Sequence, residues 1–219
     1  AAAAGIPLIE HCEEPSLSAG GEAADGLVAS WLGLRPWPAA GELRAVESAI
    51  AVLRDVISSA PTARLHLTHL STAAALAAVR SAQGEGLPLT CDVTPHHIAL
   101  TDGWIVGDRR WAWEVPVGDE LLFTTANAFD SNLRVCPPLR AASDALACRE
   151  ALRIGTALAI GTDHAPHSRE KKEVEFGLAA NGIAGIETSL SVALAAHRAG
   201  ELSLATIVAA LTTGPARLL

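Results

Sequence analysis

The sequence predicts an α/β fold in which parallel strands alternate with helices, as a doubly wound sheet or as part of a (β/α)8 barrel. Two observations predict it. Short apolar runs alternate with segments of helical periodicity, and three of the four apolar runs end in an imidazole or a carboxylate. Four strands are recognisable, whereas a closed barrel of this kind has about eight. We therefore expect an incomplete barrel.

The strands are expected where short runs rich in Leu and Ile are bounded by turn residues. Their sequences are IPLIEH, RLHLTH, LPLTCDV and TALAIGT, over residues 6–11, 64–69, 87–93 and 156–162.

The helices are expected between these strands. Apolar residues spaced by three or four positions predict one helix over 41–59, with the stripe Leu43, Val46, Ile50, Leu53 and Ile57. Three further helices each end at a glycine, and a hydroxyl residue is available to cap the first two of them. They cover 72–84 with Thr72 as the cap, 143–155 with Ser143 as the cap, and 186–200.

The segment 101–135 interrupts this alternation. It contains Trp104, Trp111 and Trp113 and has no sustained period, so we expect an irregular loop within a single domain that spans 1–219. Two interpretations stay open for this loop: a lid over a site, or a surface cover anchored by tryptophans.

Composition excludes several classes of function. The formal net charge is −8 and no basic stripe is present, which disfavours nucleic acid as a partner. The four cysteines form no C-x-x-C pair, as is typical of a reduced cytoplasmic protein. No apolar run is long enough to span a bilayer. Because the chain contains no methionine, we expect it to be a piece of a longer protein.

Chemistry-bearing side chains lie where the strands end. His11, His69 and Asp163 follow three different strands, and the carboxyl ends of parallel strands meet at one edge of a sheet. Imidazole and carboxylate ligands suit zinc. A single histidine at a strand end is more often structural, but three such residues together favour a metal site.

Several segments resemble the dihydroorotases of the amidohydrolase superfamily. They are IEHCEEP, LHLTHLST, CDVTPHHIALTD, RVCPPLR, GTDHAPHSREK and GIAGIETSL, in the order and approximate spacing of that family. The resemblance implies a (β/α)8 barrel with two zinc ions, of which this chain holds about strands five to eight and is truncated at both ends. It further implies that His11 and His69 bind one zinc, while Asp163 binds the other and is the catalytic acid and base.

The resemblance also implies the substrate contacts. His167 would bind the substrate carboxylate, together with backbone groups around Asn181 and Gly182. Cys136 stands in RVCPPLR where many relatives have an asparagine that contacts the substrate ring. A thiol is a weak hydrogen-bond donor, so either that contact is dispensable or the substrate preference differs.

The other histidines are expected to have structural roles. His66 lies three residues before His69, so we expect it to point to the opposite face and pack outward. His96 and His97 are expected to be hydrogen-bonding residues near the site rather than ligands. His164 should support or pack against the site, and His197 should lie on the surface.

The function implied is the reversible, zinc-dependent cyclisation of N-carbamoyl-L-aspartate to L-dihydroorotate in pyrimidine synthesis. One alternative is a related cyclic amidase, such as an allantoinase, hydantoinase or dihydropyrimidinase, against which His167 argues because it suits a substrate with a carboxylate. Another is a metal-free scaffold. The family's remaining metal ligands, a His-x-His pair and a bridging residue, would precede residue 1, so we expect the chain alone to bind zinc poorly and to lack turnover. A homodimer and an association with aspartate transcarbamoylase both stay open.

Overall fold

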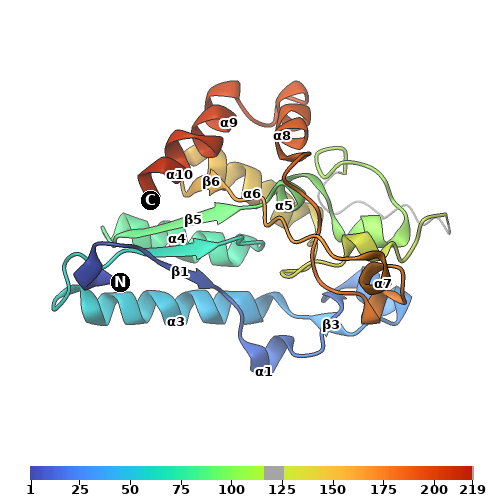
Figure 1. Cartoon of the computed structure of the whole chain (residues 1–219), viewed down its shortest axis with the longest axis horizontal. Coiled ribbons are helices and arrows are strands. Elements are labelled where there is room, and N and C mark those ends of the chain that lie inside the picture. The colour runs from blue at the N-terminus through green and yellow to red at the C-terminus, as the bar shows by residue number, and fades with distance from the viewer. Residues whose placement is uncertain (116–125, 219) are drawn as a thin grey trace.

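The computed structural model describes residues 1–115 and 126–218, and its centre is a four-stranded parallel sheet (Figure 1). The strand order is β1-β4-β5-β6. The strands are β1 (Leu8–His11), β4 (Leu65–Thr68), β5 (Leu89–Val93) and β6 (Ala157–Ile160). Each begins and ends within two residues of its predicted bounds, and the predicted α/β class with a parallel sheet is confirmed.

Several helices pack in succession along this sheet (Figure 1). Helix α3 contacts α4, α4 contacts α6 and β5, and both α6 and α9 contact β6. Their buried apolar residues form one core with those of the strands, including Val46, Val79, Leu67 and Val93. These helices are α3 (Ala39–Ile57), α4 (Ala73–Gly84), α6 (Ala142–Ile154) and α9 (Leu204–Leu211).

Of the predicted helix signals at Thr72, Gly155 and Ser143, the first two are confirmed and the third is wrong. The Thr72 hydroxyl accepts a hydrogen bond from the Ala75 amide at the start of α4, as expected of a cap. Gly155 ends α6 with a φ of 80°, a conformation that glycine adopts without strain. Ser143, however, is not a cap, because α6 already begins at Ala142 and no side chain caps it.

Several of the shorter elements, such as β3 and α7, gather beyond the carboxyl ends of the strands, at the right of Figure 1. A second apolar cluster holds them together and includes Val28, Ile105, Leu139 and Phe176. The remaining elements are β2 (Ala23–Ala24), β3 (Pro36–Trp37), α1 (Pro15–Ser18), α2 (Leu27–Leu32), α5 (Pro95–Ala99), α7 (Arg169–Lys172), α8 (Ser189–Arg198), α10 (Thr213–Leu218) and the 3-10 turns η1 (Ala2–Ala4), η2 (Asp102–Val106), η3 (Ser131–Leu133) and η4 (Phe176–Leu178). The sequence patterns did not predict the β2-β3 pair.

The predicted irregular segment is irregular wherever it is described. Apart from η2 and η3, its described residues form neither helix nor strand, and residues 116–125 lie outside the described part. The indole Nε1 of Trp104 donates to the Arg110 carbonyl at 2.7 Å. Trp111 and Trp113 stack with centroids 5.1 Å apart and pack against the main core. The tryptophans therefore anchor this segment to the body of the protein.

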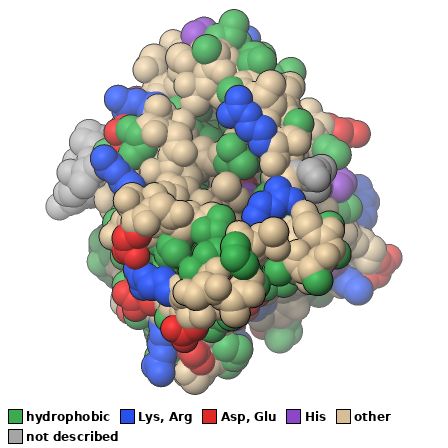
Figure 2. Space-filling view, turned by 90° about the vertical axis from the view of Figure 1, so that its left-hand side faces the viewer, with side chains coloured by type: hydrophobic (Ala, Val, Ile, Leu, Met, Phe, Trp, Pro, Cys, Tyr) green, Lys and Arg blue, Asp and Glu red, His purple; other side chains and the backbone are tan. Residues whose placement is uncertain are grey.

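Strand β1 is an open edge of the described sheet. It pairs with β4 alone among the described strands, and Leu8 and Ile9 are 53% and 52% exposed. A groove of about 630 Å³ runs beside it, lined by β1 and α3 residues such as Val52 and Val56. Figure 2 views the end of the molecule from which the strands start, where hydrophobic side chains lie among separated basic and acidic ones. None of the described helices is both long and apolar enough to cross a membrane.

Candidate active site

Three predicted site residues lie at the carboxyl ends of strands. His11 is the last residue of β1, His69 directly follows β4, and Asp163 comes three residues after the end of β6. His69 and Asp163 have φ angles of 43° and 44°. Residues with a Cβ seldom adopt this left-handed conformation, and it is found preferentially where function requires a particular side-chain direction.

Two of these residues meet directly. The Nδ1 atom of His11 lies 2.9 Å from the Nε2 atom of His69, and the rings meet edge to face with centroids 4.7 Å apart. A hydrogen bond between the two nitrogens needs one proton, whereas a cation would take a lone pair from each. Two converging imidazole nitrogens beside an acidic residue fit the donor set that zinc prefers.

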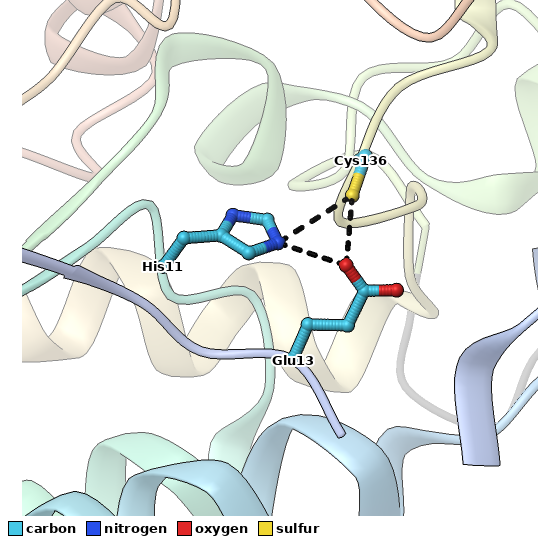
Figure 3. Close-up of side chains that lie close together, drawn as sticks. All are labelled: His11, Glu13 and Cys136. Atoms are coloured by element: carbon cyan, nitrogen blue, oxygen red, sulfur yellow. Dashed lines mark hydrogen bonds and ion pairs between the residues drawn. The ribbon is translucent and has the colours of Figure 1, made fainter. Parts of the chain in front are cut away.

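A carboxylate holds the His11 ring from its other side (Figure 3). The Nε2 atom of His11 lies 3.0 Å from Oε2 of Glu13, and Glu13 in turn accepts a 2.5 Å hydrogen bond from the Ser18 hydroxyl. Although partial burial opposes it, the bonds from Ser18 and His11 hold the pKa of Glu13 below its usual value. An ionised Glu13 keeps the proton of His11 on Nε2 and leaves Nδ1 as a lone-pair donor toward His69.

Cys136 approaches the same two side chains (Figure 3). Its Sγ atom lies 3.9 Å from Nε2 of His11 and 4.0 Å from Oε2 of Glu13. Together these residues form a group of three possible metal-binding side chains. Burial, together with the nearby Glu13 charge, raises the pKa of the Cys136 thiol to about 12. The thiol form is therefore a weak donor toward a neighbouring ligand rather than an anion.

His69 is held in its neutral form. Burial lowers its pKa, and the neighbouring His11 lowers it further, while Asp163 and Asp92 act in the opposite direction. Its Nδ1 atom is buried with no hydrogen-bond partner among the described residues. Neutral imidazole is the form that binds metal ions.

Asp92 fixes the backbone at the His69 position. One carboxylate oxygen accepts the His69 amide at 2.7 Å, and the other accepts the Thr68 hydroxyl at 3.0 Å and lies 2.8 Å from Nε2 of His66. The last strand residues of β4 and the turn that carries His69 are thereby joined to β5. Asp92 was not predicted as a site residue, although a charged residue within the apolar run LPLTCDV was a signal.

The prediction that His66 packs outward is wrong. Leu65 and Leu67 face the core shared with the helices, so His66 faces the other side of the sheet, where it contacts Thr90 and Asp92 and is 1% exposed. The prediction failed because it extended strand alternation to His69. The strand ends at Thr68, and the positive φ of His69 turns its side chain independently of that alternation.

His167, Asn181 and Gly182 form a second group. The Nε2 atom of His167 donates to the Asn181 carbonyl oxygen at 2.8 Å. Gly182 has a φ of 145°, and a Cβ placed there would lie 2.3 Å from the carbonyl oxygen of Ala165. Among the described residues, no hydrogen bond links this group to His11, His69 or Cys136. The structure thus brings together the residues expected to bind a carboxylate, but as a separate cluster.

Lys172 was missed by the sequence analysis and lies behind this second group. Its side chain is buried, and its ammonium donates to the carbonyl oxygens of Arg134, Ala180 and Gly182. Burial lowers its pKa. The available signal was a lysine in REKK directly after the motif that supplies Asp163 and His167.

The other histidines differ in their roles. His97 bonds the Thr94 hydroxyl and the carbonyl of Pro137, which confirms a structural hydrogen-bonding role. His96 packs against His97 with ring centroids 4.5 Å apart, but its Nε2 has no partner among the described residues, so it does not bond as expected. His164 accepts the Ile186 amide and therefore supports the loop, and His197 is exposed.

Comparison with known proteins finds relatives of this chain by sequence and by structure. No family model matches the chain. A dihydroorotase of Anaeromyxobacter dehalogenans is 44% identical over 218 residues, which are 99% of this chain and 45% of that protein. A dihydroorotase of Desulfotalea psychrophila is 40% identical over 213 residues, which are 97% of this chain and 44% of that protein. The chain therefore spans somewhat less than half the length of these relatives.

Solved structures with the same fold include two enzymes of related names. An L-hydantoinase (dihydropyrimidinase) from Arthrobacter aurescens superposes with a TM-score of 0.75 and 26% identity, over 99% of this chain and 44% of that one. A dihydroorotase from Campylobacter jejuni superposes with a TM-score of 0.61 and 16% identity, over 99% of this chain and 49% of that one. The four-stranded arrangement thus corresponds to part of a TIM-barrel amidohydrolase.

Proposed function

Because the chain is homologous to the dihydroorotases over nearly its whole length, we propose that it forms part of the catalytic barrel of a dihydroorotase. The whole protein would interconvert N-carbamoyl-L-aspartate and L-dihydroorotate. The observation that carries this proposal is the meeting of His11 and His69, which brings two imidazole nitrogens together at the carboxyl ends of neighbouring strands. The exposure of Leu8 and Ile9 on β1 supports a partial barrel, since the strands of a parallel sheet are usually buried on both faces.

Zinc fits the residues at these strand ends. His11 and His69 would hold one ion through Nδ1 and Nε2, and Asp163 would contribute a carboxylate to a second ion. Zinc supplies a Lewis acid that polarises a carbonyl oxygen and acidifies water. Glu13 orients the ring of His11, and Asp92 fixes the turn that carries His69, so both imidazoles are placed before any ion arrives.

Asp163 would move the proton during ring opening. Asp163 follows strand β6 at the same edge of the sheet as His11 and His69, and its charge raises the pKa of His69 against the effect of burial. A carboxylate there can accept a proton from the attacking water and pass it to the ring nitrogen that leaves the carbonyl carbon. In the direction of cyclisation it would take the proton from the attacking carbamoyl nitrogen and give it to the oxygen that leaves the carboxyl carbon as water.

His167 and the Asn181–Gly182 backbone would bind the substrate carboxylate. The bond from His167 Nε2 to Asn181 fixes the ring. The Gly182 backbone lies so close to the Ala165 carbonyl that a residue with a Cβ would not fit at position 182. Cys136 would face the substrate ring beside His11. The L-hydantoinase neighbour supports a cyclic amide without a carboxylate as the second candidate substrate.

Several wider properties stay predictions. A small molecule is the expected partner, and a homodimer, an association with aspartate transcarbamoylase and a cytoplasmic location stay predictions from the sequence. We also retain the prediction that this chain alone binds zinc poorly, because the family's further ligands are not found in it.

Substrate selectivity of the full-length protein that carries this chain tests the proposal. Initial rates with L-dihydroorotate, dihydrouracil, hydantoin and allantoin at equal concentration should show hydrolysis of L-dihydroorotate and little of the others. Preferential hydrolysis of a ring without a carboxylate would reject the proposal in favour of a related cyclic amidase. A protein that hydrolyses none of them and contains no zinc would be a scaffold.

A further inference from the structure

The buried ammonium of Lys172 connects two loops of the candidate site. Its residue is 7% exposed, and Nζ donates to the carbonyl oxygens of Ala180 at 2.9 Å, Gly182 at 3.0 Å and Arg134 at 3.3 Å. Arg134 lies two residues before Cys136, and the other two carbonyls lie on either side of Asn181. One side chain therefore holds the backbone of both segments expected to contact substrate.

The three consecutive carbonyls of 180–182 are divided between two side chains. Those of Ala180 and Gly182 accept from Lys172, whereas that of Asn181 accepts from His167 at 2.8 Å. The Arg134 carbonyl that accepts from Lys172 also accepts the Gly182 amide at 2.9 Å. Lys172 thereby fixes the position from which Asn181 directs the ring of His167.

The Lys172 ammonium bonds to neutral acceptors; burial and Arg134 lower its pKa, while the Asp130 charge raises it. Among the described residues, its hydrogen bonds all go to carbonyl oxygens, and no carboxylate forms an ion pair with it. A buried charge is costly unless it is paired or hydrogen-bonded, and an ammonium that bonds only neutral carbonyls keeps its full charge toward its surroundings. An anion bound on the far side of the 180–182 backbone would be stabilised by it.

We propose that Lys172 is a positioning residue for the ligand carboxylate, which acts by holding the 180–182 backbone against His167 and by placing a fixed positive charge behind it. This inference rests on the proposed function, since the carboxylate site is part of it. It differs from a merely structural role because it predicts a loss of affinity that depends on the charge of the ligand.

The test compares two ligands that differ in one charge. The affinities of orotate and of its methyl ester are measured by calorimetry on the full-length protein. The wild type should prefer orotate, and Lys172→Met should reduce that preference by about tenfold, as expected for loss of one charge-assisted interaction. Lys171→Met, at the exposed neighbouring lysine, is the matched control and should leave the preference unchanged. An unchanged preference in Lys172→Met would overturn the inference.

A second variant tests the inference if Lys172→Met does not fold. Lys172→Arg keeps the charge, so it should retain the preference within about threefold, and a tenfold loss would overturn the role of the charge. A wild type that does not prefer orotate over its ester would overturn both the carboxylate site and this inference. Absence of dihydroorotate hydrolysis in a wild type that does prefer orotate would instead reject only the proposed reaction.

Discussion

His11 and His69 are separated by 58 residues in the chain, yet their Nδ1 and Nε2 atoms lie 2.9 Å apart. The parallel pairing of β1 with β4 sets His11 opposite Thr68, the residue before His69, so the register of two strands places both rings at one edge. The left-handed turn at His69 then directs its ring toward His11. The geometry of the site thus follows from strand register and one strained residue.

Replacement of Glu13 by glutamine should weaken zinc binding. The variant keeps the size of the side chain but removes the charge that holds the proton of His11 on Nε2. We expect a loss of zinc affinity of about 10-fold to 100-fold in the full-length protein. Competition with a chromogenic chelator measures this affinity.

Glu14→Gln is the control for that experiment. Within the described part of the chain, the Glu14 carboxylate bonds to Ser16 at the start of α1 and pairs with Arg44 rather than with His11, so its loss should leave zinc affinity unchanged. Equal zinc affinity in Glu13→Gln and the wild type would show that Glu13 does not orient the ring.

Replacement of Gly182 by alanine should displace His167 from its position beside Asn181. The new Cβ would lie 2.3 Å from the Ala165 carbonyl oxygen and 3.1 Å from the His167 ring, at a φ of 145° that alanine rarely adopts. We expect KM for dihydroorotate to rise by about tenfold or more, because displacement of His167 costs at least one hydrogen bond. Steady-state kinetics measure it. Gly84→Ala, where a Cβ meets nothing within 4 Å, should behave as the wild type, and an unaltered KM in Gly182→Ala would contradict the assignment.

His96 should make the protein less stable as the pH falls. Burial, and next to it the nearby His69, lower the pKa of His96 from 6.5 to about 3. Between these values the unfolded chain binds a proton that the folded protein does not, so the stability contribution is lost as the pH falls below 6.5. From pH 7 to pH 5 the loss should be about 2 kcal/mol for this group.

Urea unfolding of the full-length protein at both pH values measures that loss. In His96→Gln the difference in unfolding free energy between pH 7 and pH 5 should be smaller than in the wild type. If the two proteins lose equal stability over this range, His96 does not carry the effect.

The sequence predicted the parts of the fold that depend on local patterning. The four strands, the helices α3, α4, α6 and α8 and the convergence of His11 and His69 could be predicted, because apolar periodicity marks the elements and parallel strands share one carboxyl edge. The orientation of His66 was predicted wrongly, because it was counted from His69, which lies beyond the end of strand β4.

The supporting residues could not be predicted for a different reason. Asp92 and Lys172 act through contacts with residues that their own sequence neighbourhood does not specify. Asp92 and Lys172 reach partners 23 and 38 residues away, which only the folded chain brings close. The β2-β3 pair likewise forms by long-range docking of two very short strands.

The rate of L-dihydroorotate hydrolysis by the full-length protein, before and after removal of metal, tests the central claim most directly. We predict hydrolysis by the purified protein, its loss after dialysis against a chelator, and its return when zinc is added. The Asp163→Asn variant should be slower by a factor on the order of 100 to 10,000 under zinc-loaded conditions. Hydrolysis that is unaffected by chelation, or an Asp163→Asn variant as fast as the wild type, would contradict the account.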